Sequence, residues 1–158
     1  MPVERRAVNR LNVIMASSIE AGMIVHPAVI VHGAADARAA LAVGLPVTLL
    51  SAPGAVLAGG CLWWREIVSL ARGEHPDTPA TDILDCADAS GLAVGALRSG
   101  VCRLVLWPDA PGWSAVAAIA ERQGGFVLRQ APPALDMAHR NAMRRLHVWL
   151  LNSTAAGA

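Results

Sequence analysis

The sequence predicts an α/β domain with a mainly parallel, five-stranded sheet and helices on both faces of that sheet. Three observations predict this class. The strand candidates are short and largely apolar, helical segments separate them, and glycine or proline stands at most junctions. Such strands are typical of parallel sheets that are covered on both faces. A unit of helix, glycine, strand and Pro-Gly turn also occurs at residues 37–54 and 93–112, and in weaker form at 117–133.

The expected strands are built mainly on Val, Ile and Leu. In chain order they are residues 28–31, 47–50, 82–84, 103–106 and 126–129. Prolines follow several of them, and a proline cannot donate a hydrogen bond to a neighbouring strand, so it marks a strand end. Because parallel strands are joined by right-handed crossovers, all their carboxyl ends are expected along one edge.

The expected helices lie between these strands and after the last one. They are residues 34–43, 55–72, 89–99, 113–123 and 136–151. Gly44, Gly100 and Gly124 follow three of them, because glycine readily adopts the left-handed conformation that ends a helix. The last helix is amphipathic, with an apolar stripe opposite its arginines. Trp63 and Trp64 are adjacent on the long helix, so they cannot both be central core residues.

The expected organisation has three parts: an N-terminal helix or lead-in at residues 1–22, a core at 23–134, and a C-terminal helix and tail at 135–158. Five strands fit a flavodoxin-like or Rossmann-like three-layer arrangement by analogy. A chain of 158 residues suits one domain.

Composition excludes several functions. With net charge +1 and only 16% charged residues, the chain is neither a disordered tail nor a general nucleic-acid binder. All 13 basic residues counted as Lys+Arg are arginine, which excludes a P-loop lysine and a Schiff-base lysine. The three cysteines form no C-x-x-C pair, which indicates reduced thiols in a cytoplasmic protein. No two histidines have a metal-ligand spacing, so no metal is expected, and no cofactor is indicated.

Residues 39–64 contain no charge and are long enough to span a membrane. Pro46 and the run Ser51–Gly54 interrupt this stretch, and a turn inside lipid would leave backbone groups unpaired. We therefore expect a buried strand, a turn and a helix here, and no membrane partner.

Ligands of open α/β sheets bind just beyond the carboxyl ends of the strands. The candidate ligand-binding residues are those that follow the expected strands, namely His32, Ser51, Gly54, Asp85, Asp88, Trp107 and Asp109. The turn at Ser51–Gly54 opens a helix, and a helix N-terminus can receive an anion. The structural alternative is that Ser51 and Asp88 cap helices. His32 is the better acid–base candidate, because it ends a buried strand.

The sequence leaves three classes of function open. The first is binding of a small, possibly anionic, molecule at the strand ends. The second is a non-catalytic interaction protein that forms a homodimer or binds a partner protein through its tryptophan-bearing helices. The third is an enzyme that uses His32 or Asp85 as acid or base. A homo-oligomer is expected, and no nucleic acid.

Overall fold

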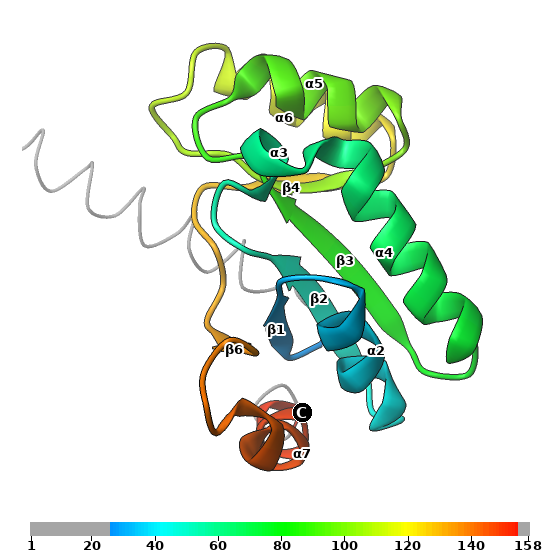
Figure 1. Ribbon diagram of the computed structural model, residues 1–158. Coiled ribbons are helices and arrows are strands. Elements are labelled where there is room, and N and C mark those ends of the chain that lie inside the picture. The colour runs from blue at the N-terminus through cyan, green and yellow to red at the C-terminus, as the bar shows by residue number, and fades with distance from the viewer. Residues whose placement is uncertain (1–25, 155–158) are drawn as a thin grey trace, which may run out of the picture.

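The computed structural model describes residues 26–154, in which strands and helices alternate (Figure 1). The strands are β1 (Ala28–Val31), β2 (Val47–Ser51), β3 (Ala80–Asp85), β4 (Arg103–Val105), β5 (Phe126–Leu128) and β6 (Ala134–Asp136). The helices are α2 (Ala34–Ala42), α3 (Ala55–Ala58), α4 (Gly60–Glu74), α5 (Ser90–Arg98), α6 (Trp113–Arg122) and α7 (Ala142–Thr154). The predicted α/β class is confirmed. The predicted lead-in at 1–22 lies outside the described residues.

The strands form one parallel sheet in the order β5-β4-β3-β2-β1-β6. Val29 of β1 stands opposite Leu49 on one side and Leu135 on the other. The prediction of five strands is wrong by one, because pairing with β1 makes residues 134–136 a sixth strand. The order differs from the flavodoxin order 2-1-3-4-5 and the Rossmann order 3-2-1-4-5-6, since β1 to β5 follow one another across the sheet.

The helices between β1 and β5 pack on one face of this sheet. Right-handed crossovers that always advance in one direction leave their helices on the same side. Accordingly, Leu49 and Leu84 belong to a core that includes residues of α2, α4, α5 and α6. Their chain neighbours Leu50 and Ile83 belong to a second cluster on the opposite face. No helix of the described chain contributes to that second cluster, so the expected helical layer there stays a prediction.

The predicted helix at residues 55–72 is broken into α3 and α4. Gly60 has a φ of +75°, which a right-handed helix does not contain, so the chain turns there. Gly59 lies tightly against Trp63, since a Cβ at this position would come within 2.7 Å of the indole. Beyond the break, Trp64 is 0% exposed and Trp63 is only partly buried. The prediction that the two tryptophans do not share the central core is confirmed.

The C-terminal helix α7 begins at Ala142 and not at residue 136 as predicted. The chain up to residue 136 is held extended by β1, and a turn follows before the helix. Leu146 and Leu150 of α7 are buried in the main core. Trp149 donates a hydrogen bond from Nε1 to the first carbonyl of β1 at 2.8 Å. The helix therefore closes the β6 end of the sheet.

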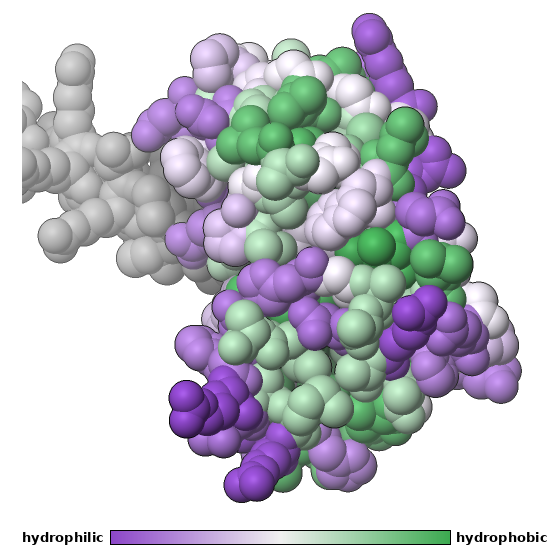
Figure 2. All heavy atoms as spheres, viewed as in Figure 1, coloured by the Kyte–Doolittle hydropathy of each residue, from purple (hydrophilic) through white to green (hydrophobic). Residues whose placement is uncertain are grey.

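The uncharged stretch at residues 39–64 forms the end of α2, then β2, α3 and the first turn of α4. This confirms the predicted sequence of a buried strand, a turn and a helix. Within residues 26–154, no helix combines the length and apolar character that a bilayer crossing requires. Apolar side chains nevertheless gather on the outer surface over α3 and α4 (Figure 2), where Leu57 and Leu62 are exposed.

Candidate functional site

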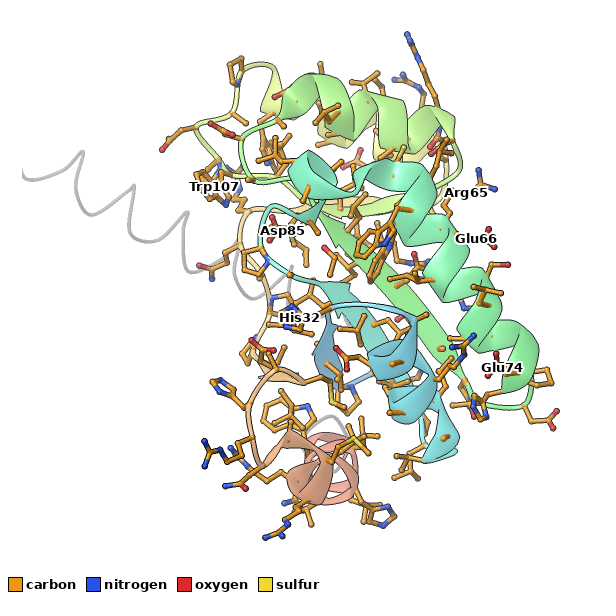
Figure 3. The ribbon with its side chains drawn as sticks, viewed as in Figure 1. His32, Arg65, Glu66, Glu74, Asp85 and Trp107 are labelled. Atoms are coloured by element: carbon orange, nitrogen blue, oxygen red, sulfur yellow. The ribbon has the colours of Figure 1, made fainter. Side chains whose placement is uncertain are left out.

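The carboxyl ends of the strands lie along one edge, and the candidate residues follow them. Figure 3 shows His32 after β1, Asp85 at the end of β3 and Trp107 beyond β4 on this edge. Adjacent strands are about 4.8 Å apart, so three spacings, about 14 Å, separate the ends of β1 and β4. A single small ligand that contacts His32 is therefore not expected to reach Trp107. The predicted site divides into a β2–β4 part and a β1 part.

In the first part, Ser51 and Asp85 form a buried hydrogen-bonded pair. They are 1% and 3% exposed. The Ser51 hydroxyl accepts the Asp85 backbone N–H at 2.8 Å, and Asp85 Oδ1 accepts the amides of Gly54 at 3.0 Å and Ala87 at 2.9 Å. The carboxylate thus ties the loop after β2 to the loop after β3. These contacts give both side chains a clear structural role.

Ala87 is the residue on which this arrangement converges. Its φ of +49° is left-handed, which costs a non-glycine residue about 1 kcal/mol or more. Its N–H donates to Asp85 Oδ1, and its carbonyl accepts the Trp107 amide at 2.7 Å. Together these bonds hold the strained residue between the ends of β3 and β4.

The outer residues of this part are open to solvent. Asp88, Trp107 and Asp109 are exposed, with Trp107 at 51%. The alternative that Asp88 caps the next helix is wrong, because the N-cap of α5 is Ala89 and receives no side-chain hydrogen bond. Trp113 donates from Nε1 to the Leu106 carbonyl, one residue beyond β4, at 2.9 Å, and its ring lies under the Arg129 guanidinium at 4.1 Å.

The second part is a histidine–aspartate pair. Nε2 of His32 lies 2.6 Å from Oδ1 of Asp136, and the side chains are 39% and 30% exposed. Asp136 Oδ1 also accepts the Ala138 amide at 2.9 Å, and Asp36 accepts the backbone N–H of His32 at 2.9 Å. Both ring and backbone of the histidine are therefore fixed. Since the carboxylate occupies Nε2, the other ring nitrogen, Nδ1, is the one available to a ligand.

The pKa of Asp136 is lowered from the usual 3.8. Partial burial raises this pKa. The hydrogen bonds from the Ala138 amide and His32, together with the charges of His32 and His139, lower it by more than burial raises it. The carboxylate therefore remains an ionised acceptor at neutral pH and keeps the imidazole oriented.

Sequence reasoning selected His32 but missed Asp136, which it placed in the last helix. The pair exists because β6 lies beside β1, about a hundred residues away in sequence. One signal was present. The dipeptide Leu-Asp ends β3 as Leu84-Asp85, and the same dipeptide ends β6 as Leu135-Asp136.

The thiol of Cys86, which follows Asp85, is buried. Burial, followed by the charges of Asp85 and Cys61, raises the pKa of Cys86 to about 12. A thiol with this pKa is not a nucleophile at neutral pH.

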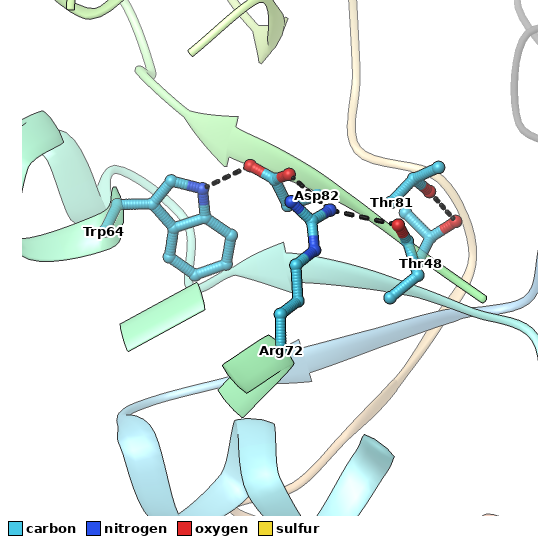
Figure 4. Close-up of polar contacts among 6 residues, drawn as sticks. Thr48, Trp64, Arg72, Thr81 and Asp82 are labelled. Atoms are coloured by element: carbon cyan, nitrogen blue, oxygen red, sulfur yellow. Dashed lines mark hydrogen bonds and ion pairs between the residues drawn. The ribbon is translucent and has the colours of Figure 1, made fainter. Parts of the chain in front are cut away.

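A separate polar cluster joins α4 to β3 (Figure 4). Arg72 Nη2 donates to Asp82 Oδ1 at 2.9 Å and to the Ala80 carbonyl at 3.0 Å, and Trp64 Nε1 donates to Asp82 Oδ2 at 3.2 Å. A cavity of about 500 Å³ opens beside this cluster, between α4 and the turn before β4. It lies away from the strand carboxyl ends, so it is not the predicted site.

Comparison with models of known protein families gave no match, and no curated protein matched the sequence. Among residues 26–154, no group of three or more His, Cys, Asp or Glu side chains is arranged to hold a metal ion. The candidate site is therefore defined by the geometry of the strand ends.

Proposed function

We propose that this domain binds a small polar molecule at the carboxyl ends of β1 and β6, with His32 as its principal contact. The supporting observation is the 2.6 Å pair of His32 and Asp136. This pair lies where the strand order reverses, since the chain runs outward from β1 to β5 and returns to β6 on the other side. Ligands of open α/β sheets bind at such reversal points.

The charges around His32 favour a ligand that donates hydrogen bonds. The carboxylates of Asp36 and Asp136 both contact this histidine, and they would repel an anion. Nδ1 of a neutral imidazole whose Nε2 faces a carboxylate accepts a hydrogen bond from a hydroxyl or amino group. The anion expected at Ser51–Gly54 has less support, because the Gly54 amide already binds Asp85. We therefore favour a neutral or cationic ligand.

A thermal-shift panel of nucleosides, sugars, polyols, amino acids and amines tests this proposal. A ligand at 100 times its Kd stabilises the fold by about 2.7 kcal/mol, or several degrees in Tm. We expect the shift to be lost in His32→Ala, reduced in Asp136→Asn and kept in the control His75→Ala, a change in the loop before β3. Binding that is equal in all four proteins would refute the proposal.

The same pair favours proton transfer as a second candidate function. A carboxylate that orients an imidazole is the arrangement that general acid–base catalysis requires. If a ligand identified in the panel is turned over, the rate should fall in His32→Ala and its pH dependence should change in Asp136→Asn. Unchanged turnover in both variants would exclude this role.

A further inference from the structure

The second face of the sheet, opposite the main core, carries an apolar band from β1 to β5. Ile30 stands opposite Leu50, and Leu50 stands opposite Ile83. Further along the band, Val105 stands opposite Leu128. Four of these five side chains, all except Ile30, are only 1% exposed. Side chains on an open sheet face point into water, so exposures this low indicate that another layer covers the band.

No helix of residues 26–154 contributes to this cluster. The helices α2 to α7 contribute their buried residues to the main core on the other face. Residues 129–133 connect β5 to β6 without a helix, and four of these five residues are exposed. The described part of the chain therefore supplies no layer that accounts for the burial of the band.

The sequence that precedes β1 has the periodicity of an amphipathic helix. At about 3.6 residues per turn, one stripe of this segment is apolar and is interrupted only by Ser18. Its members are Ala7, Val8, Leu11, Ile14, Met15 and Ile19. The opposite side carries most of the polar residues, and Val13 lies among them. Such a stripe is typical of a helix that packs on an apolar surface.

We propose that residues 1–25 cover the second face of the sheet, with the stripe at residues 7–19 packed on the apolar band. The band crosses four strand spacings of about 4.8 Å, which is about 19 Å. A helix rises about 1.5 Å per residue, so the stripe is about 18 Å long. Residues 20–27 join the stripe to the start of β1. Eight extended residues reach about 26 Å, which is enough to bring the stripe to the middle of the band.

The same chain is a better occupant of this face than a second copy. A second copy that covered the band would leave the stripe at residues 7–19 without an apolar surface to pack on. The stripe and the band each need such a surface, and β1, at which the segment enters the sheet, is one of the strands that carry the band. Their contact gives the sheet helices on both faces, as is typical of parallel sheets.

Thermal unfolding of the full chain, with variants on the two sides of the expected helix, tests the proposal. Leu11→Asp and Met15→Asp place a charge against the apolar band, so each should lower Tm by about 5 °C or more. Val13→Asp is the matched control, because residue 13 lies on the polar side, and its Tm should stay within about 2 °C of the wild type. The dye anilinonaphthalene sulfonate binds exposed apolar surface, so its fluorescence should increase with the two stripe variants and not with the control.

The Tm of the wild type should not depend on protein concentration, because the covering segment belongs to the same chain. If Leu11→Asp does not fold, Leu11→Ala and Val13→Ala give the same comparison with a smaller shift. Equal Tm values in the stripe variants and the control overturn the proposal, whether all of them are lowered or none is. A Tm that rises with concentration in the wild type but not in Leu11→Asp also overturns it, because another copy then covers the band.

Discussion

Replacing Asp85 by alanine is expected to destabilise the fold rather than merely to remove a ligand contact. The carboxylate is 3% exposed and accepts two backbone amides, those of Gly54 and Ala87. An unpaired buried donor costs about 1–3 kcal/mol. The Ala87 amide is buried and should cost most of this range, and the half-buried Gly54 amide about 1 kcal/mol. The expected loss is about 2–4 kcal/mol.

Urea unfolding followed by tryptophan fluorescence measures this loss as a lower midpoint with an unchanged m value. For a domain of this size each kcal/mol lowers Tm by about 2–4 °C, so a decrease of about 4–16 °C is expected. Asp88→Ala is the matched control. It is exposed and lies on the same loop, so its effect should stay within about 0.5 kcal/mol. Asp85→Asn retains an acceptor oxygen and should lose less than alanine.

One result would refute this reasoning. If Asp85→Ala is as stable as Asp88→Ala and loses binding of a ligand found in the panel, the carboxylate serves the ligand and not the two loops. The proposed division of the strand ends into a structural and a binding part would then be wrong.

The remaining predictions concern pH, packing and thiol chemistry. The pKa of Asp136 is lower in the folded chain than the usual 3.8, so its stabilising contribution is complete above that pH and is lost as pH falls through the folded pKa. Asp136→Asn should therefore lose less stability than the wild type between pH 6 and pH 3, measured as the difference between the urea midpoints at these two pH values. Equal losses in the two proteins would contradict this prediction. A Cβ at Gly125 would lie 1.8 Å from a backbone oxygen, so Gly125→Ala should cost about 1–3 kcal/mol or more. By contrast, Gly95→Ala on the open face of α5 should stabilise the fold by about 0.5–1 kcal/mol. Calorimetry that finds Gly125→Ala more stable than Gly95→Ala would disprove this account. Cys86, with a pKa of about 12, should resist alkylation at pH 8 until the chain unfolds. Mass spectrometry measures this labelling, and alkylation of Cys86 in the folded protein would contradict the prediction.

Local signals explain which elements were predictable. Five strands and most helices follow from apolar runs separated by glycine and proline, which act over a few residues. The break at Gly60 was missed, because the sequence Gly59-Gly60 is compatible with a tight helix contact as well as with a turn. The left-handed φ of Gly60 distinguishes the two only in three dimensions.

The position of the candidate residues was also predictable, but their availability was not. A residue that follows a parallel strand must lie at the carboxyl edge, and Ser51 and Asp85 do lie there. Whether such a side chain faces a ligand depends on the amides that other loops bring to it. Here the loops after β2 and β3 bring two amides to one carboxylate oxygen.

The histidine–aspartate pair depends on strand order, which no local pattern encodes. Pro132 and Pro133 follow the expected strand at residues 126–129 and were interpreted as marking a strand end, yet proline also favours an extended chain in the residue before it. The connection at residues 129–133 contains no helix, and it delivers Leu135 and Asp136 to the free side of β1. Within the described residues, that return places the Asp136 carboxylate against the His32 ring, whereas Asp36 contacts only the backbone of His32. A function based on this pair is therefore a property of the topology, and substitutions that weaken β6 should impair it even though they leave His32 itself unchanged.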